Sequence, residues 1–284
     1  MGFWDRFLKI DRRWIFLVVW IAVVIPLIKP LGLPTHITPP VQKLYDFIDD
    51  LQGEEKAVLL SFDFDPSTMP ELLPMGVAII RHCFAKKIPI IVYGGLYPQG
   101  VGMAKMAIDM AKTDFPDIVY GRDYVFLGYV PGVSLVILSI GESIQGTFGN
   151  DYFGNRLDTL PLTMHVDNYE KIGIVVDLSG SSIPAAWINY AYQRYGCRIG
   201  CGTTAVSAAQ YYPYLQTGQF VGMLGGLKGA AEYEELLERN GIPTGRRTAT
   251  IGMDAQSVVH LLIILLIILG NIGFFYVRRR ERRV

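Results

Sequence analysis

Uncharged apolar segments lie near both ends of the chain. The first, residues 14–28, reads WIFLVVWIAVVIPLI and follows a segment with four basic residues. The second, residues 255–277, contains no Asp, Glu, Lys or Arg and precedes an arginine-rich tail. A helix needs about 20 apolar residues to cross a bilayer. The pattern predicts two transmembrane helices, at 14–33 with Lys29 snorkelling to the interface, and at 255–277.

The basic flanks predict the orientation of the chain. Positive flanks stay on the cytoplasmic side, so we expect a two-pass plasma-membrane protein with both termini in the cytoplasm. The first segment is predicted to be a signal anchor, because no small-x-small cleavage site follows it. The remaining predicted parts are a cytoplasmic N-terminus at 1–13, a proline-rich linker at 34–40, an extracytoplasmic domain at 41–250 and a cytoplasmic arginine-rich tail at 278–284.

Between the two segments, apolar runs alternate with amphipathic stretches, which is typical of a mainly parallel sheet covered by helices. The predicted strands are Ala57–Phe64, Ile88–Tyr93, Tyr124–Tyr129, Ile172–Leu178, Arg198–Cys201 and Phe220–Leu224. The predicted helices are Pro70–Lys87, Gly102–Lys112, Val133–Ile144, Pro184–Tyr195 and Gly229–Asn240. A methionine stripe at Met103, Met106 and Met110 is interpreted as core, and the polar connector at 141–170 as a functional loop or lid.

The middle of the chain resembles itself. DFDPSTMP at 63–70 matches DLSGSSIP at 177–184, and both follow an apolar run. The economical interpretation is an internal duplication of βαβ halves, at about 56–141 and 170–241.

Charge and cysteine content narrow the class of protein. The whole chain has a net charge of +0, but residues 34–254 hold 16 Lys and Arg against 23 Asp and Glu. An acidic domain is a poor partner for nucleic acid, so we expect none. Cys197 and Cys201 would lie about 13 Å apart along a strand, too far for a disulfide, so free thiols are predicted.

Polar loops follow the predicted strands and indicate where a site would lie. Parallel strands deliver their carboxyl ends to one edge of the sheet, and ligands bind there. The loops at that edge are 63–70, 94–102, 128–132, 177–184, 202–207 and 225–229. The predicted ligand-binding residues are Asp63, Asp65, Ser67, Thr68, Gly94, Gly95, Asp177, Ser179, Gly180, Ser181, Ser182, Gly202, Thr203, Gly225 and Gly226.

These Asp and Ser loops have two functional interpretations and one structural one. Free N–H groups at helix N-termini favour a small anion, whereas two carboxylates from matching loops favour a cation. In the structural interpretation the same residues only cap helices, with Thr68 and Glu71 forming a capping box.

A second candidate is the run CGTTAVSAAQYY at 201–212, preceded by DLSGSSIPAAW at 177–187. Together they resemble the signal-peptide-peptidase and Clp group of serine peptidases. The resemblance implies that Ser207 is the nucleophile and that Gly180 and its neighbours supply oxyanion donors. The chain departs from the family pattern at Ala208-Ala209, which replaces Gly-Gly. The basic candidates are Lys228 and His165, and the alternative is that Ser207 is a small packing residue.

Three further positions are candidates of other kinds. Cys201 lies at a helix N-terminus, where a thiol pKa can fall. His260 and Asn271 lie in an apolar segment, where polar groups are functional or bond a neighbouring helix. There is no P-loop, no GxGxxG after a strand, no HExxH and no CxxC, so no cofactor or metal is expected.

Taken together, these patterns predict a membrane-anchored α/β domain that acts as a non-catalytic binding or assembly module. Its expected partners are the lipid bilayer and either a second copy or other membrane proteins. The alternatives are a Clp-like serine hydrolase and a domain that binds a small anion at the Asp and Ser loops.

Overall fold

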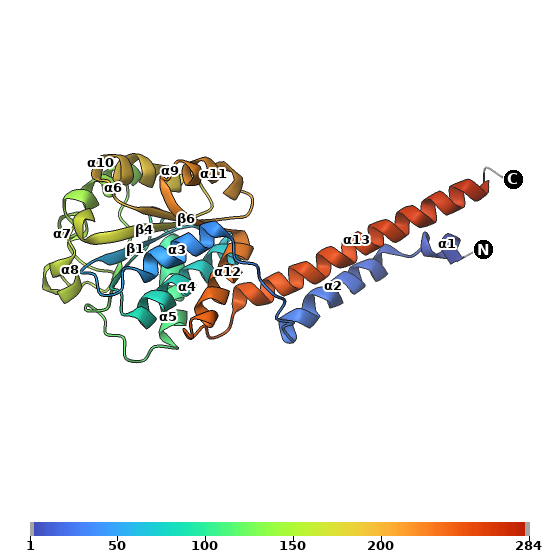
Figure 1. The fold of residues 1–284 in the computed structure, drawn as a ribbon, viewed down its shortest axis with the longest axis horizontal. Coiled ribbons are helices and arrows are strands. Elements are labelled where there is room, and N and C mark those ends of the chain that lie inside the picture. Colours follow the sequence, from blue (N-terminus) through green and yellow to red (C-terminus); the bar gives the residue numbers. More distant parts are fainter. Residues whose placement is uncertain (1–2, 282–284) are drawn as a thin grey trace. The chain divides into compact units, whose positions relative to one another are not determined.

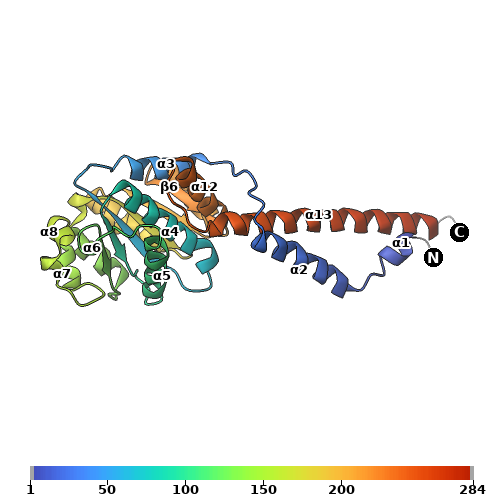
Figure 2. The same cartoon turned by 90° about the horizontal axis from the view of Figure 1, so that it is seen from below.

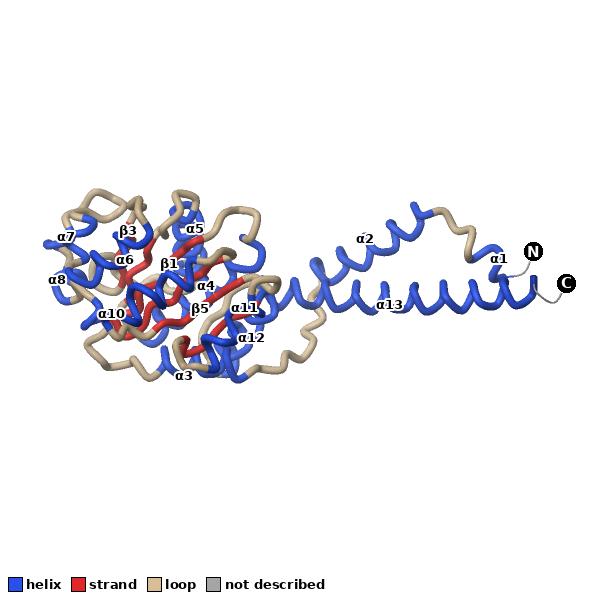
Figure 3. Tube along the Cα trace, turned by 90° about the horizontal axis from the view of Figure 1, so that it is seen from above, coloured by secondary structure: helices blue, strands red, loops and turns tan. Residues whose placement is uncertain are grey.

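The computed structural model describes residues 3–281 of the chain (Figure 1). The chain divides into two compact units. One comprises residues 1–34 and 250–284, and the other comprises residues 35–249. The second unit contains the sheet and its covering helices, with the strands gathered in its middle (Figure 3).

Six parallel strands form one sheet in the order β3-β2-β1-β4-β5-β6. The strands are β1 (Ala57–Asp63), β2 (Ile90–Tyr93), β3 (Tyr124–Leu127), β4 (Ile172–Ser179), β5 (Ile199–Thr203) and β6 (Phe220–Gly225). Each predicted strand is present, so the prediction of an α/β fold with a parallel sheet is confirmed. These segments form strands because they are runs of β-branched and other apolar residues, nearly all of them buried.

Helices cover both faces of the sheet. One face carries α3 (Pro39–Asp49), α4 (Met69–Lys86), α5 (Gly100–Lys112) and α12 (Gly226–Arg239) (Figures 1 and 2). The other carries α6 (Val133–Glu142), α9 (Ile183–Trp187), the short π-helix η3 (Ile188–Tyr192), α10 (Gln193–Tyr195) and α11 (Ala208–Gln216) (Figure 1). In the strand order, β2 and β3 follow β1 towards one edge of the sheet, and β5 and β6 follow β4 towards the other edge. With helices on both faces, the sheet is doubly wound.

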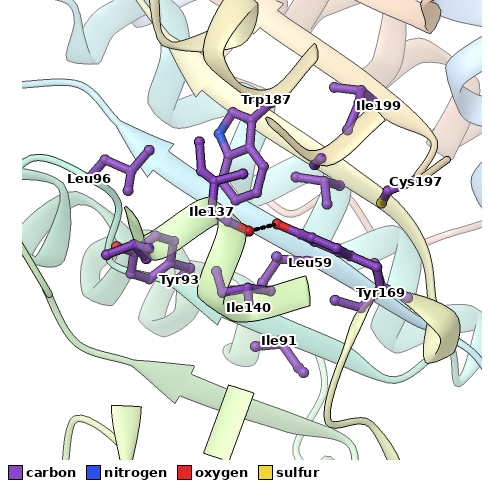
Figure 4. Packing of buried hydrophobic residues seen from close by; sticks show 14 of the residues in the cluster. Leu59, Ile91, Tyr93, Leu96, Ile137, Ile140, Tyr169, Trp187, Cys197 and Ile199 are labelled. Carbon is purple, nitrogen blue, oxygen red and sulfur yellow. Dashed lines mark hydrogen bonds between the residues drawn. The ribbon is translucent and has the colours of Figure 1, made fainter. Parts of the chain in front are cut away.

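The core on the α6–α9 side is closed by the long connector between β3 and β4. Tyr169 donates a hydrogen bond to the Ile137 carbonyl at 2.7 Å, and the side chains of both lie among the buried residues around Trp187 (Figure 4). The connector forms α7 (Ile144–Phe148), η1 (Leu157–Thr159), α8 (Pro161–His165) and η2 (Tyr169–Lys171). The interpretation of 141–170 as a lid needs correction, because Ile144, Leu157, Leu162, Val166 and Tyr169 belong to the core, although Tyr152, Phe153 and Met164 are exposed. A functional role of this connector stays a prediction.

Two other predictions need correction. The methionine stripe of α5 is only partly core, since Met103 is buried but Met106 is 41% exposed. The linker predicted at 34–40 ends earlier than expected, because Pro39 and Pro40 open α3. Proline is tolerated in the first turn of a helix, where its missing N–H costs nothing.

The other unit contains the helices α1 (Phe3–Phe7), α2 (Arg12–Ile28) and α13 (Thr248–Glu281), of which α2 and α13 are mainly apolar. Among the described residues, one helix is long and apolar enough to cross a membrane, over residues 248–280. Helix α2 ends at Ile28 instead of residue 33, because Pro30 disfavours helical backbone at the residue before it. Its 17 residues span about 25 Å, so a second span is not confirmed. Residues 282–284 of the tail lie outside the described part.

Candidate ligand-binding crevice

The strand order reverses between β1 and β4, and the loops after these two strands therefore diverge. Asp63 ends β1 and lies in register with Ser179, which ends β4. In doubly wound sheets, ligands bind in the crevice outside the carboxyl ends of the strands at this reversal. The sequence places polar loops at both of these ends.

A crevice of about 340 Å³ opens there, within the size range of small-ligand sites. Six of its lining residues belong to the predicted set: Asp63, Asp65, Ser67, Thr68, Gly180 and Ser181. Sequence reasoning missed Phe64, Tyr97 and Gln99. The available signal was that Tyr97 and Gln99 follow Gly94-Gly95 in a loop already placed at this edge.

Gly95 brings the loop after β2 onto the end of β1. It has a φ of +88°, and a Cβ at this position would overlap the carbonyl oxygen of Phe62. Glycine alone allows this approach. The next residue, Leu96, donates its backbone N–H to Asp63 Oδ1 at 2.5 Å. The Gly94-Gly95 pair therefore allows the loop to place the Leu96 N–H against Asp63, which orients the Asp63 carboxyl group.

Asp63 and Asp177 are buried carboxyl groups on adjacent strands, 2% and 0% exposed. Asp63 accepts hydrogen bonds from Leu96 N–H and from the Ser61 hydroxyl, the latter at 2.5 Å. Asp177 has no hydrogen-bond donor on either oxygen among the described residues. An ionised carboxylate without a donor is very costly to bury.

Burial raises the pKa of Asp63 and raises the pKa of Asp177 well above its usual range. The negative charge of Asp63 adds to the effect on Asp177, whereas hydrogen bonds to Asp63 counteract the effect of burial on Asp63. Two adjacent carboxyl groups in such a setting do not both ionise near neutral pH. A proton on Asp177 gives that residue a hydrogen bond to donate to Asp63.

Further polar groups without hydrogen-bond partners surround the two acids. They are Tyr93 OH, Trp187 Nε1 and Thr203 Oγ1, and all three residues are fully buried. Figure 4 shows the Trp187 ring in the core cluster to which Leu96 and Tyr93 also belong. The Trp187 N–H contributes to lowering the pKa of Asp63, but it stands outside hydrogen-bond geometry, so we treat it as a spare donor.

The loop after β1 is held by Asp65 and not by a capping box. Asp65 Oδ1 accepts from the Ser67 amide at 2.8 Å and from the Ser67 hydroxyl at 2.5 Å. These two bonds lower the pKa of the exposed Asp65 carboxyl, which is therefore ionised at neutral pH. Thr68 makes no side-chain cap, and Glu71 accepts from the Ala205 amide at 2.8 Å.

The loop after β4 is organised in a similar way. The Ser179 hydroxyl accepts from the Ser181 amide at 3.1 Å, and the two hydroxyls are 2.9 Å apart. Ser182 is exposed and makes no side-chain cap. Tyr211 from α11 donates to the Ser181 carbonyl at 2.5 Å, so α11 fixes one wall of the crevice.

Ser207 lies next to Gly180, as the Clp resemblance implies, but within residues 3–281 no basic side chain bonds its hydroxyl. Its Oγ is 3.5 Å from the Gly180 carbonyl and 3.1 Å from the Thr204 hydroxyl. Lys228 pairs with Glu232, one turn along α12. His165 lines a different pocket, with Glu55 and Lys56 at the amino ends of the strands.

The remaining predicted glycines lie at close packing contacts. A Cβ on Gly202 would meet Leu178 and Met75, and one on Gly226 would meet Ala205. Gly94 has Val101 and a backbone carbonyl around it, and Gly225 contacts Ala208. These glycines shape the sheet edge and do not line the crevice.

The other chemical candidates are explained by structure. All three cysteines are free and buried, as predicted. Burial raises the pKa of Cys201 well above its usual value, so this thiol is not activated. Asn271 donates to the Ile267 carbonyl of its own helix at 2.9 Å. Among residues 3–281, no cluster of three or more His, Cys, Asp or Glu forms a metal site.

No family model, curated protein or solved structure matches this chain. The local resemblance to Clp-type peptidases therefore rests on the quoted motifs alone.

Proposed function

We propose that this protein is a membrane-anchored binding domain that holds a small ligand in the crevice between β1 and β4. The ligand bears amino or hydroxyl groups that donate hydrogen bonds to Asp63 and Asp65. One observation carries the proposal: the residues that line the crevice offer carboxylate, hydroxyl and carbonyl oxygens and include no Lys, Arg or His.

The charge of the crevice distinguishes this ligand from an anion. Asp65 is exposed and ionised, and Asp63 lies below it at the end of β1. An anion entering here meets negative charge with no cation to offset it, which opposes binding. An ammonium group meets the opposite situation, and the half-exposed ring of Tyr97 offers an aromatic face as well. The anion hypothesis is therefore the weaker one.

The membrane anchor of the proposed binding domain is α13. Its apolar side chains are largely exposed, for example Leu261 at 67% and Phe275 at 64%. We further propose that α2 enters the membrane as a second span, since Trp14 and Phe16 are equally exposed. The basic flanks favour cytoplasmic termini and an extracytoplasmic domain.

One polar contact supports this arrangement of the apolar helices. The buried carboxylate of Asp254, near the start of α13, accepts the backbone N–H groups of residues 31, 32 and 33 at 2.9–3.1 Å. These donors follow the end of α2, and in an apolar environment each would be costly to leave unbonded.

The hydrolase alternative has one observation in its favour, the proximity of Ser207 to the Gly180 loop. A serine needs a base to become a nucleophile. The two hydrogen bonds of its hydroxyl involve the Thr204 hydroxyl and a carbonyl, neither of which is a base at neutral pH. A binding function is therefore better supported than catalysis by Ser207.

A matched series of ligands tests the binding proposal. Putrescine, butanediol and succinate share a four-carbon chain and differ in charge at their ends. Calorimetric titration of the full chain in detergent micelles should give the tightest binding for putrescine and none for succinate. Asp65→Asn should weaken putrescine binding several-fold, because the amide keeps the turn to Ser67 but loses the charge.

Asp109→Asn is the control for that experiment. Asp109 is exposed on α5, pairs with Lys105 and does not line the crevice. Its substitution should leave putrescine binding unchanged. Preferential binding of succinate, or equal binding of putrescine by wild type and Asp65→Asn, would contradict the proposal.

A further inference from the structure

Asp177 is unusual among the buried acids because nothing stabilises its charge. It lies in the middle of the sheet, in register with Ser61 on β1 and Cys201 on β5. Neither of its oxygens has a hydrogen-bond donor among the described residues. Because an unpaired buried charge is strongly disfavoured, a group in this position keeps its proton.

Asp63 has the opposite surroundings. Leu96 N–H and the Ser61 hydroxyl both point to its carboxylate, so its ionised form is the better solvated one. The donors therefore decide which member of the pair carries the negative charge. Asp63 also lines the crevice, whereas Asp177 is not among the lining residues. The charged member faces the ligand, and the protonated member lies beneath it.

We propose that Asp63 and Asp177 form an acid pair that holds one proton. The proton is bound to Asp177, which donates a hydrogen bond to the Asp63 carboxylate. An ammonium ligand that contacts Asp63 displaces this proton. The displacement is balanced in charge: the Asp177 O–H bond breaks, the proton leaves to solvent, and the positive charge of the ligand replaces it. The exchange step rests on the proposed function, whereas the stored proton does not.

Buried donors without partners lie around the pair, and they would suit the state in which Asp177 has lost its proton. Trp187 Nε1–H, Tyr93 OH and the Thr203 hydroxyl are buried and have no acceptor. Thr203 lies in register with Ser179, and Ser179 with Asp63, so the three side chains share one row on one face of the sheet. Buried donors without acceptors are rare, and a second carboxylate would supply one.

Ionised Asp65 lines the same crevice, whereas the other buried titratable groups near the pair carry no competing charge. They are Tyr93 on β2, Cys201 on β5 and Tyr211 on α11. Burial raises the pKa of each of them, so all three are neutral at neutral pH. Trp187, from α9, is uncharged. The charge of the site is therefore set by the Asp63 and Asp177 pair, by the ionised Asp65 and by the ligand.

Infrared spectroscopy of the full chain in detergent micelles tests the stored proton. At neutral pH the wild type should show the carbonyl stretch of a protonated carboxylic acid, and Asp177→Asn should lack it. Carbon-13 labelling of aspartate should shift this band, which assigns it to Asp even if the variant fails to fold. Absence of the band in the wild type, or its persistence in a folded Asp177→Asn protein, would overturn the proposal.

Putrescine then tests the exchange. Adding it to the wild type should remove the band, and calorimetry in two buffers of different ionisation heat should show release of about one proton per ligand. Asp109→Asn should behave like the wild type. Binding of putrescine with the band intact and no proton release would overturn the exchange. If putrescine does not bind, the proposed function fails and the band still decides the stored proton.

Discussion

Asp63 and Asp177 are buried side by side on adjacent parallel strands, yet only Asp63 has hydrogen-bond donors. The doubly wound topology produces this pairing, because β1 and β4 are neighbours in the sheet although about 110 residues separate these acids along the chain. Because only Asp63 has donors, we assign the ionised, ligand-contacting role to Asp63 and the proton to Asp177.

Substitution by asparagine should affect the two acids in opposite ways. In Asp177→Asn, the amide can donate to Asp63 as the protonated acid does, so the melting temperature at neutral pH should rise. Asp63→Asn removes the negative charge that accepts hydrogen bonds from the Leu96 N–H and the Ser61 hydroxyl. The free energy of unfolding should therefore fall by about 1–3 kcal/mol. Chemical denaturation of both variants checks this. Equal destabilisation by the two substitutions would contradict the assignment.

The pair should also make stability depend on pH. The pKa of Asp177 is raised in the folded state, so above the ordinary aspartate pKa of about 3.9 the folded protein binds one proton more than the unfolded chain. Stability conferred by this proton is present at low pH and falls by about 1.4 kcal/mol per pH unit until the folded pKa is reached. Asp177→Asn should remove that slope. Parallel stability–pH curves for the two proteins would argue against the stored proton.

His82 acts in the other direction over part of this range. Burial lowers its pKa to about 4, and it bonds Tyr233 OH at 2.8 Å and Asp49 at 3.0 Å. Stability from His82 is lost as pH falls from about 6.5 to about 4. The two slopes oppose each other there, so the difference between wild type and Asp177→Asn isolates the acid pair.

Gly95→Ala should be far more damaging than Gly154→Ala. Both glycines have positive φ, +88° and +89°. The alanine methyl would overlap the Phe62 carbonyl at Gly95, whereas nothing lies within 4 Å at Gly154. Backbone strain alone costs about 1–2 kcal/mol, and overlap adds about 1–3 kcal/mol. Comparable melting temperatures for the two variants would show that the loop after β2 does not pack as described.

Ser207 should not be activated. The full chain should show no fluorophosphonate labelling, and Ser207→Ala should leave putrescine binding unchanged, since the serine does not line the crevice. A catalytically competent serine peptidase treated in parallel controls for the reagent. Labelling that disappears in Ser207→Ala would establish a base that the geometry does not provide and would favour the hydrolase alternative.

Introduced cysteines should reveal the orientation in the membrane. The three native thiols are buried, so they should react slowly with a membrane-impermeant maleimide. Glu55→Cys should react on intact cells, because it lies in the extracytoplasmic domain under the proposed topology. Lys9→Cys should react only after permeabilisation. The reverse pattern, or labelling of both on intact cells, would contradict the topology.

The strands were predictable because the sequence signal for each is local. Each buried parallel strand is a short apolar run. Three of the six strands end at Asp63, Ser179 or Gly225, and a glycine directly follows β2 and β3. Helix α3 was missed because Pro39 and Pro40 suggested a linker, although proline suits a first helical turn. The expected capping box failed because Glu71 bonds the amide of Ala205, a distant residue that local spacing cannot reveal.

The candidate site was only partly predictable for the same reason. The polar loops indicated Asp63 and the Gly180 region, because strand ends in a parallel sheet converge. The contribution of Tyr97 depends on how the loop after β2 folds over Phe62. The contrast between Asp63 and Asp177 depends on donors from Leu96 and Ser61, which only the assembled sheet places.

Carbon-13 NMR of aspartate carboxyl groups, with Asp63 and Asp177 assigned through their asparagine variants, tests the central claim most directly. The pH titration is made on the full chain with and without putrescine. We predict that Asp63 is ionised and Asp177 protonated at neutral pH, and that Asp177 becomes ionised when putrescine binds. Titration of both groups near the ordinary aspartate pKa, unchanged by putrescine, would contradict the account.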